Sequence, residues 1–211
     1  KTLLITGASS GLGRAMTVRL IKEHNCKVIG IGQSEPKMKS LIDELSYQKD
    51  AFTYQLFDVG VKKNWEIFSE KILANNINID ILINNAGIAH IGLLSDMSSE
   101  EWHTLMGTNL DSVFYMSKAV IPHMVHCHSG KILNVSSVWG EVGASCEAAY
   151  SASKGAVNSL TKALAKELAP SHISVNGVSF GVIDTDMNRC FDEEERASLA
   201  EEIPYGRFAS P

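Results

Sequence analysis

Short apolar runs rich in β-branched residues alternate along the chain with longer segments in which apolar residues recur every three or four positions. The short runs have the length of strands buried on both faces, and they lie at 3–6, 27–31, 51–57, 79–83, 131–135 and 173–178. The longer segments have helical spacing and lie near 11–24, 35–47, 61–75, 99–126 and 150–169. This alternation predicts an α/β fold with a single doubly wound parallel sheet, right-handed crossovers and helices on both faces.

The alternation runs through the whole chain, and no tract of Pro, Gly or Ser separates one part from another. We therefore predict a single domain over residues 1–211. A length of 211 residues with 45% hydrophobic residues suits a packed core and excludes a disordered or collagen-like chain. No apolar run approaches the roughly 18 to 20 residues of a membrane-spanning helix, and the first residues lack the apolar core of a signal peptide. This pattern predicts a cytoplasmic protein.

Charge and cysteine content argue against a nucleic-acid-binding protein and against a metal site. Nineteen Lys and Arg against 24 Asp and Glu give a net charge of -5, which argues against a nucleic-acid partner. The four cysteines form no Cys-x-x-Cys pair, so we expect buried or idle thiols at Cys26, Cys127, Cys146 and Cys190. Three histidines, His123, His126 and His128, bracket Cys127, but no carboxylate or second cysteine completes a ligand set. We predict no metal site.

A polar side chain interrupts the apolar stripe of the segment 99–126. That stripe consists of Trp102, Leu105, Met106, Leu110, Val113, Val120, Ile121 and Met124, and Asn109 lies inside it. A buried amide needs hydrogen-bond partners, so Asn109 is either a structural tie between core elements or a group that holds water or substrate. The residues alone favour the structural tie.

A glycine-rich loop joins the first predicted strand to the first predicted helix. It contains Gly7, Ser9, Ser10, Gly11, Leu12 and Gly13. Glycines at such a junction let the backbone turn tightly and approach a pyrophosphate, and the free N–H groups of the helix start attract the anion. The loop lacks the Gly-Lys-Ser/Thr of a nucleotide-hydrolysing P-loop. We predict a dinucleotide site, with a ligand-free glycine turn as the alternative.

The end of the second strand bears on which dinucleotide is bound. An acidic side chain there would bind a free ribose 2′-hydroxyl and repel a 2′-phosphate. This sequence has Gln33 and Ser34 at that position and no acidic residue until Glu35, which favours NADP and does not exclude NAD. Three cations are near in sequence, namely Arg14, Lys37 and Lys39.

Three candidate catalytic side chains follow the fifth strand. Ser137 ends that strand, and Tyr150 and Lys154 lie four residues apart on one face of the next helix. The carboxyl ends of parallel strands meet at one crevice, so we expect all three beside the glycine loop. An ammonium near a phenol lowers the pKa of the phenol, which suits Tyr150 as a general acid or base, and Ser137 could hydrogen-bond a carbonyl oxygen.

An acyl hydrolase is the alternative chemistry for a serine at a strand end. Ser137 is not flanked by the glycines of the Gly-x-Ser-x-Gly elbow of α/β-hydrolases, and none of the seven histidines falls where a catalytic triad would need it. The sequence therefore argues against hydrolysis.

Taken together, these motifs resemble the Tyr-x-x-x-Lys branch of the short-chain dehydrogenase/reductases. The matching segments are 6–13, 58–59, 84–87 and the four positions Asn109, Ser137, Tyr150 and Lys154. The resemblance implies a Rossmann fold in which Asn109 holds a water, Ser137 and Tyr150 bind the substrate oxygen, and Lys154 also binds the nicotinamide ribose. It thus reverses the structural interpretation of Asn109. It adds cofactor-binding residues beyond the glycine loop and Gln33: Asp58, Val59, Asn85, Ala86, Gly87, Tyr150, Lys154, Ile183 and Thr185.

Two departures from that family affect these expectations. The family usually has Pro-Gly after the sixth strand, whereas this sequence has Phe180-Gly181, which places a ring beside the expected nicotinamide site and weakens the roles given to Ile183 and Thr185. The family also continues into another helix and a seventh strand from about Pro211, so we expect that C-terminal strand to be missing and one sheet edge to be uncovered.

The segment 139–144 is most like the 3-oxoacyl-[acyl-carrier-protein] reductase group, which implies NADPH-dependent reduction of a 3-oxoacyl thioester in fatty acid biosynthesis. An acidic carrier protein would need basic contacts. We expect His128, Lys131, Ser171 and His172 at the rim, whereas the acidic segment 192–195 argues against a strong carrier interaction.

The sequence leaves several other functions open, as well as the role of the segment 192–203. The alternatives are a dehydrogenase of another alcohol, such as a sugar or steroid, a dinucleotide sensor without chemistry, and a scaffold with an empty crevice. The family pairs subunits through 99–126 and 150–169, which implies a homotetramer or homodimer. The segment 192–203 is either a mobile lid or a solvated acidic helix.

Overall fold

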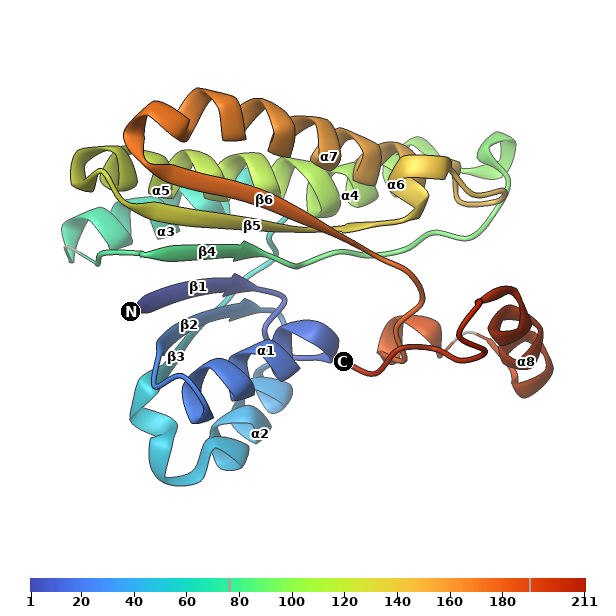
Figure 1. Cartoon of the computed structure of the whole chain (residues 1–211), viewed down its shortest axis with the longest axis horizontal. Helices are drawn as coiled ribbons and strands as arrows, with labels where there is room; N and C mark the ends of the chain where they lie inside the picture. Colours follow the sequence, from blue (N-terminus) through green and yellow to red (C-terminus); the bar gives the residue numbers. More distant parts are fainter. Residues whose placement is uncertain (76, 190) are drawn as a thin grey trace.

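Six parallel strands form one twisted sheet in the computed structural model, which describes residues 1–75, 77–189 and 191–211 (Figure 1). The strand order is β3-β2-β1-β4-β5-β6. The strands are β1 (Thr2–Thr6), β2 (Lys27–Gly32), β3 (Phe52–Leu56), β4 (Ile81–Asn84), β5 (Gly130–Ser137) and β6 (Ile173–Phe180). All six predicted strands are thus present, and the order reverses between β1 and β4, where open parallel sheets bind ligands.

Helices cover both faces of the sheet, as the alternation predicts. Helices α1 (Gly11–Lys22) and α2 (Glu35–Leu45) lie on one face, and α3 (Lys62–Ala74), α5 (Ser112–Cys127) and α7 (Ala148–Leu168) lie on the other (Figure 1). Neighbouring residues of β1 point to opposite faces, so Leu3 and Ile5 pack with α1 and α2 while Leu4 packs with α3 and α5. The continuous apolar runs of the strands follow from this two-sided burial.

The predicted helix 99–126 is present but not continuous. Helix α4 (Ser99–Met106) begins at a capping box formed by Ser98 and Glu101. A π-helical turn (Gly107–Asp111) then separates it from α5. Such turns are frequent at functional sites, and this one contains Asn109.

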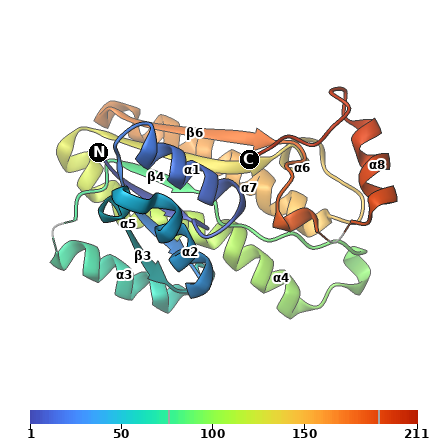
Figure 2. The same cartoon turned by 90° about the horizontal axis from the view of Figure 1, so that it is seen from below.

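Two short helices lie beyond the carboxyl ends of β5 and β6. Helix α6 (Trp139–Val142) follows β5 and was not predicted, and α8 (Glu193–Glu202) occupies the acidic segment 192–203. Figures 1 and 2 show α8 past the carboxyl end of β6. In the described residues β6 is an outer strand of the sheet, and the segment after it is held by a bridge between Ile183 and Ala209.

The described cysteines are free thiols that differ in exposure. Cys127 and Cys146 are exposed and Cys26 is half-buried, whereas Cys190 lies outside the described residues. The sulfur of Cys127 lies 3.5 Å from Nε2 of His123, and no group of three metal-ligating side chains is found in the described part of the chain. No described helix combines the length and the apolar character needed to cross a membrane.

Candidate active site

A cavity of about 750 Å³ opens at the carboxyl ends of β1, β4, β5 and β6. Its walls bring together segments far apart in the sequence: the glycine loop, the residues after β4, the end of β5, the start of α7 and the segment after β6. The sequence motifs thus meet at one crevice, at the strand ends where the fold predicts a ligand.

The glycine loop has the geometry of a phosphate cradle. Gly7 and Gly11 have φ of +68° and +50°, a region that favours glycine. A Cβ on Gly13 would clash with the carbonyl group of Gly7, so only glycine lets α1 begin this close to the loop. Ser10 is the N-cap of α1 but makes no side-chain capping bond, which leaves the first N–H groups of the helix to a bound anion. This arrangement fits the pyrophosphate of a dinucleotide.

The loop after β4 is attached to the glycine loop by Thr6. The hydroxyl of Thr6 accepts hydrogen bonds from the backbone N–H groups of Asn85 and Ala86, each 2.9 Å long. The amide nitrogen of Asn85 donates to the carbonyl oxygen of Thr6 at 3.0 Å. Asn85 therefore stabilises the cradle as well as lining the cavity.

Most of the expected cofactor-binding residues line the cavity: Gly7, Ser10, Gly11, Leu12, Asn85, Ala86, Gly87, Tyr150, Lys154, Ile183 and Thr185. Five do not: Ser9, Gly13, Gln33, Asp58 and Val59. Gln33 is exposed at the end of β2, and the Val59 side chain is buried in the core, so its side chain is unavailable to a ligand. The carboxylate of Asp58 accepts a hydrogen bond from the backbone N–H of Gly60 at 2.8 Å.

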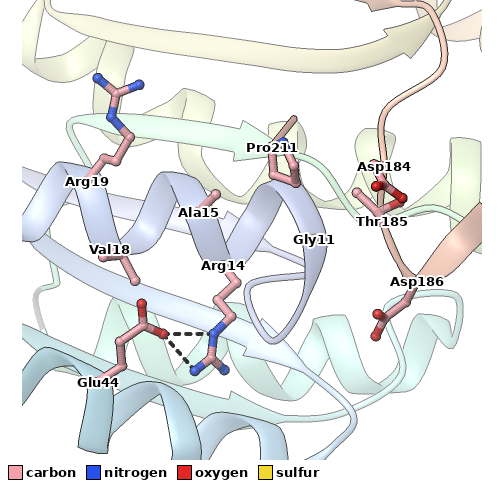
Figure 3. A pocket seen from close by; sticks show the side chains of 10 residues that line it. All are labelled: Gly11, Arg14, Ala15, Val18, Arg19, Glu44, Asp184, Thr185, Asp186 and Pro211. Carbon is pink, nitrogen blue, oxygen red and sulfur yellow. Dashed lines mark hydrogen bonds and ion pairs between the residues drawn. The ribbon is translucent and has the colours of Figure 1, made fainter. Parts of the chain in front are cut away.

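The three cations near the end of β2 are already paired. Arg14 contacts Glu44 at 2.7 Å in a second hollow of about 510 Å³ beside the glycine loop, and Figure 3 shows its guanidinium directed at that carboxylate. Lys39 pairs with Glu35 at 2.9 Å. Lys37 pairs at 2.8 Å with Asp186, which follows β6 and lines both hollows.

Lys154 is almost fully buried at the base of the cavity. Its ammonium donates a hydrogen bond of 2.9 Å to the carbonyl oxygen of Val135 in β5. Burial lowers the pKa of Lys154 from 10.5 to about 8. The amine lies 5.8 Å from the centroid of the Tyr150 ring, so the four-residue spacing does place both side chains on one face of α7.

The expectation that the pKa of Tyr150 lies below its usual value is wrong. Burial raises the pKa of Tyr150, a hydrogen bond with Ser137 lowers it, and the charge of Glu147 raises it further, with burial the largest of the three effects. The phenol is therefore a protonated group at neutral pH. Ser137 is itself held at the end of β5, where its hydroxyl accepts a hydrogen bond from the backbone N–H of Trp139 at 3.2 Å.

Asn109 is fully buried and does not line the cavity. Its side-chain oxygen accepts from the backbone N–H of Ile88 at 2.8 Å, and its amide nitrogen donates to the carbonyl oxygen of Ile88 and the hydroxyl of Ser153. These bonds tie the loop after β4 to α7, as the structural interpretation predicts. A Cβ on Gly87 would lie 3.4 Å from both the Asn109 oxygen and the Lys154 nitrogen, so the amide is close to the ammonium.

Sequence reasoning missed Glu147 and most of the apolar residues of the cavity wall. Glu147 lines it three positions before Tyr150, and the indole of Trp139 hydrogen-bonds the Glu147 carboxyl. The spacing of one helical turn from Tyr150 was the available signal. Phe180 also lines the cavity, as expected from its position after the sixth strand.

The residues expected at the rim lie elsewhere. His128 and Lys131 flank the start of β5, and Ser171 and His172 immediately precede β6. These positions are at the amino ends of the strands, whereas the cavity is at the carboxyl ends. The rim prediction is therefore wrong for this chain's own cavity, since proximity in sequence to a strand does not say which end of the strand a residue marks.

A family model described as short chain dehydrogenase matches residues 1–196. The chain belongs to the short-chain dehydrogenase family. It is 38% identical over 211 residues to the 3-oxoacyl-[acyl-carrier-protein] reductase FabG of Vibrio cholerae, a match that covers 100% of this chain and 85% of the relative.

Two solved structures at 32% identity share the fold of this chain. The 3-ketoacyl-(acyl-carrier-protein) reductase from Brucella melitensis, complexed with NADH, has a TM-score of 0.90 at 32% identity and covers 100% of this chain and 86% of its own. A gluconate 5-dehydrogenase from Burkholderia cenocepacia, in complex with NADP and tartrate, has a TM-score of 0.90 at 32% identity, with coverage of 100% and 83%. As a short-chain dehydrogenase, the chain is an NAD(P)-dependent oxidoreductase.

Proposed function

We propose that this short-chain dehydrogenase reduces the 3-oxo group of a small acyl thioester to a secondary alcohol at the expense of NADPH. The observation that carries the proposal is the character of the cavity wall around Ser137 and Tyr150. Apart from these hydroxyls that wall is largely apolar, with Ile88, Ile91, Val138, Trp139, Phe180, Phe191 and Leu199. An acyl chain and its thioester gain more from such a wall than a polyhydroxylated sugar acid does.

Each residue of the site has a separate role in the reduction. NADPH, when bound along the glycine loop, supplies the hydride. Ser137 and Tyr150 hold the carbonyl oxygen, and the phenol of Tyr150, kept protonated by its burial, donates the proton that completes the alcohol. Lys154 lies under the Tyr150 ring and compensates the phenolate that remains until solvent returns the proton. Asn109 holds the loop after β4 in place and, as the family resemblance implies, a water of the proton relay.

Several contacts support NADP as the preferred dinucleotide. The end of β2 offers the exposed Gln33 and the α2 N-cap Ser34, neither of which repels a 2′-phosphate. The nearest carboxylate, Glu35, is paired with Lys39. Lys37 stands in the first turn of α2, where an incoming phosphate could replace its carboxylate partner Asp186.

A second candidate is oxidation of a sugar acid, because one solved neighbour is a gluconate 5-dehydrogenase with an organic acid bound. Activity assays with both substrates distinguish thioester reduction from sugar-acid oxidation. We expect NADPH absorbance to fall when the acetoacetyl thioester of N-acetylcysteamine is added, with no NADPH formed from gluconate and NADP. Turnover of gluconate alone would contradict the thioester proposal, and NADH preferred over NADPH would contradict the cofactor assignment.

The carrier of the acyl group and the assembly of the chain are part of the same proposal. Relatives are reductases of acyl groups on an acyl carrier protein by name, but the first turn of α8, next to the cavity, carries Glu193, Glu194 and Glu195. We therefore expect acetoacetyl-coenzyme A to be used at least as well as the thioester of an acidic carrier protein. We further propose a homodimer or homotetramer through α4, α5 and α7, where Phe114 is 48% exposed.

A further inference from the structure

An acidic side chain stands beside the proposed reaction centre. Glu147 is the N-cap residue of α7, is half-buried, and lines the cavity together with Ser137 and Tyr150. It precedes Tyr150 by three residues, and both residues line the cavity. A group in this position meets whatever part of the substrate adjoins the carbonyl.

The contact with Trp139 favours the ionised form of this carboxyl. Burial raises the pKa of Glu147 above its usual value, and the hydrogen bond from Trp139 offsets part of that rise. An indole N–H can only donate, so its partner oxygen serves as an acceptor, which a carboxylate does best. Glu147 and Tyr150 line the same cavity, and the charge of Glu147 raises the pKa of Tyr150.

No described cation balances Glu147 inside the cavity. The other lining carboxylate, Asp186, forms ion pairs with Lys37 and Arg189. The lining cation Lys154 is directed at the carbonyl oxygen of Val135. The described contact of Glu147 is the neutral indole of Trp139, and none of the ion pairs among the described residues includes this carboxylate, although it lines the cavity.

We propose that Glu147 is a specificity-determining residue that rejects substrates with an anionic group next to the reducible carbonyl and selects neutral esters and thioesters. Like charges a few ångströms apart in a partly buried site repel by enough to lower affinity about tenfold or more. The inference rests on the proposed carbonyl reduction and narrows its substrate class, because free 3-oxo acids are excluded while their thioesters are accepted.

Acetoacetate and ethyl acetoacetate make a matched pair of substrates, because they share the reducible carbonyl and differ in the charge beside it. For the unaltered chain with NADPH we expect kcat/KM to be at least about tenfold lower for acetoacetate. Glu147→Gln keeps the size and an acceptor oxygen for Trp139 but removes the charge. We expect it to reduce the preference for the ester by about tenfold; a preference that stays the same overturns the proposal.

Two further measurements keep the inference separate from the proposed reaction. Glu141→Gln is the control, because Glu141 is exposed on α6 and does not line the cavity; it should leave the preference unchanged. Binding of acetoacetate to the NADP complex, followed by Trp fluorescence, needs no turnover and should be about tenfold tighter in Glu147→Gln. Tighter binding without any turnover would reject the proposed reaction but support the charge selection, whereas equal binding in both chains rejects the charge selection.

Discussion

Lys154 shows how strongly one buried side chain can respond to its surroundings. With its pKa lowered to about 8 by burial, the folded chain loses this proton near pH 8, whereas the unfolded chain keeps it until about pH 10.5. Between these values the unfolded state binds more protons, so the contribution of Lys154 makes the folded state more stable as pH rises. Below pH 8 both states are protonated and the buried charge is at its most costly.

Replacement by methionine tests this pH dependence. Between pH 7.5 and 10, the free energy of unfolding of the unaltered chain should rise relative to that of Lys154→Met, by roughly 3 kcal/mol at most. Urea denaturation of both chains at the two pH values measures the difference. Parallel pH profiles for the two chains would show that Lys154 is already neutral or well solvated.

For single residues, the sequence predicted which side chains form the site better than it predicted their pKa values. The four-residue spacing of Tyr150 and Lys154 correctly predicted a shared helical face, because helix geometry fixes it. The predicted direction of the pKa shift of Tyr150 was wrong, because desolvation depends on how deeply the fold buries the phenol. Glu147 was missed for the same reason: a lone acidic residue gains meaning only when the cavity is known.

Among the elements, the glycine loop and α1 are the most constrained by close packing. Gly13→Ala would drive a methyl group into the backbone of Gly7 and to 2.7 Å from the Asn85 amide nitrogen, neither of which can move without breaking the cradle. We expect a loss of about 2 to 3 kcal/mol of stability and weaker dinucleotide binding. Thermal unfolding and a cofactor titration measure both.

Gly181→Ala is the matched control for that substitution, because a Cβ there meets no atom within 4 Å. Its stability should stay within about 0.5 kcal/mol of the unaltered chain. Equal losses for the two variants would mean that loss of glycine freedom, and not the clash at Gly13, decides the outcome.

In the segment 99–126 the sequence predicted the helix but neither its π-helical turn nor the partners of Asn109. Its apolar periodicity was correct on both sides of Asn109, but a π-helical turn inserts its extra residue without disturbing that pattern enough to be seen. The partners of Asn109, Ile88 and Ser153, come from two other parts of the chain. Sequence periodicity reports burial, not the identity of long-range partners, so both alternatives for Asn109 could be framed but not resolved from it.

For the whole molecule, the alternation of strand and helix was sufficient to predict the parallel sheet and its two covered faces. Which strand end forms the ligand edge was also predicted, because parallel strands share that edge. The residues around the cavity mouth were not predicted correctly, because the segments before β5 and β6 were assigned to the wrong end of the sheet. The position of α8 near the mouth, with Leu199 on the cavity wall, likewise emerges only in three dimensions.

The ion pair between Lys37 and Asp186 connects the two halves of the fold, α2 and the segment after β6. If the 2′-phosphate of NADP replaces Asp186 as the partner of Lys37, Lys37→Ala should reduce the preference for NADP over NAD by about five- to tenfold, because one charged contact is lost. Dissociation constants for both dinucleotides give the ratio. Lys49→Ala, in the turn after α2, is the control; a loss of affinity common to NADP and NAD in Lys37→Ala would assign Lys37 a structural role only.

The central claim is that the Tyr150 hydroxyl protonates a carbonyl reduced in this cavity, and Tyr150→Phe tests it most directly. The measurement is the rate of NADPH consumption with the acetoacetyl thioester, paired with the dissociation constant for NADPH. We predict a rate at least about a hundredfold lower in the variant, with NADPH affinity nearly unchanged. A variant that binds NADPH and reduces the thioester as fast as the unaltered chain would contradict the account.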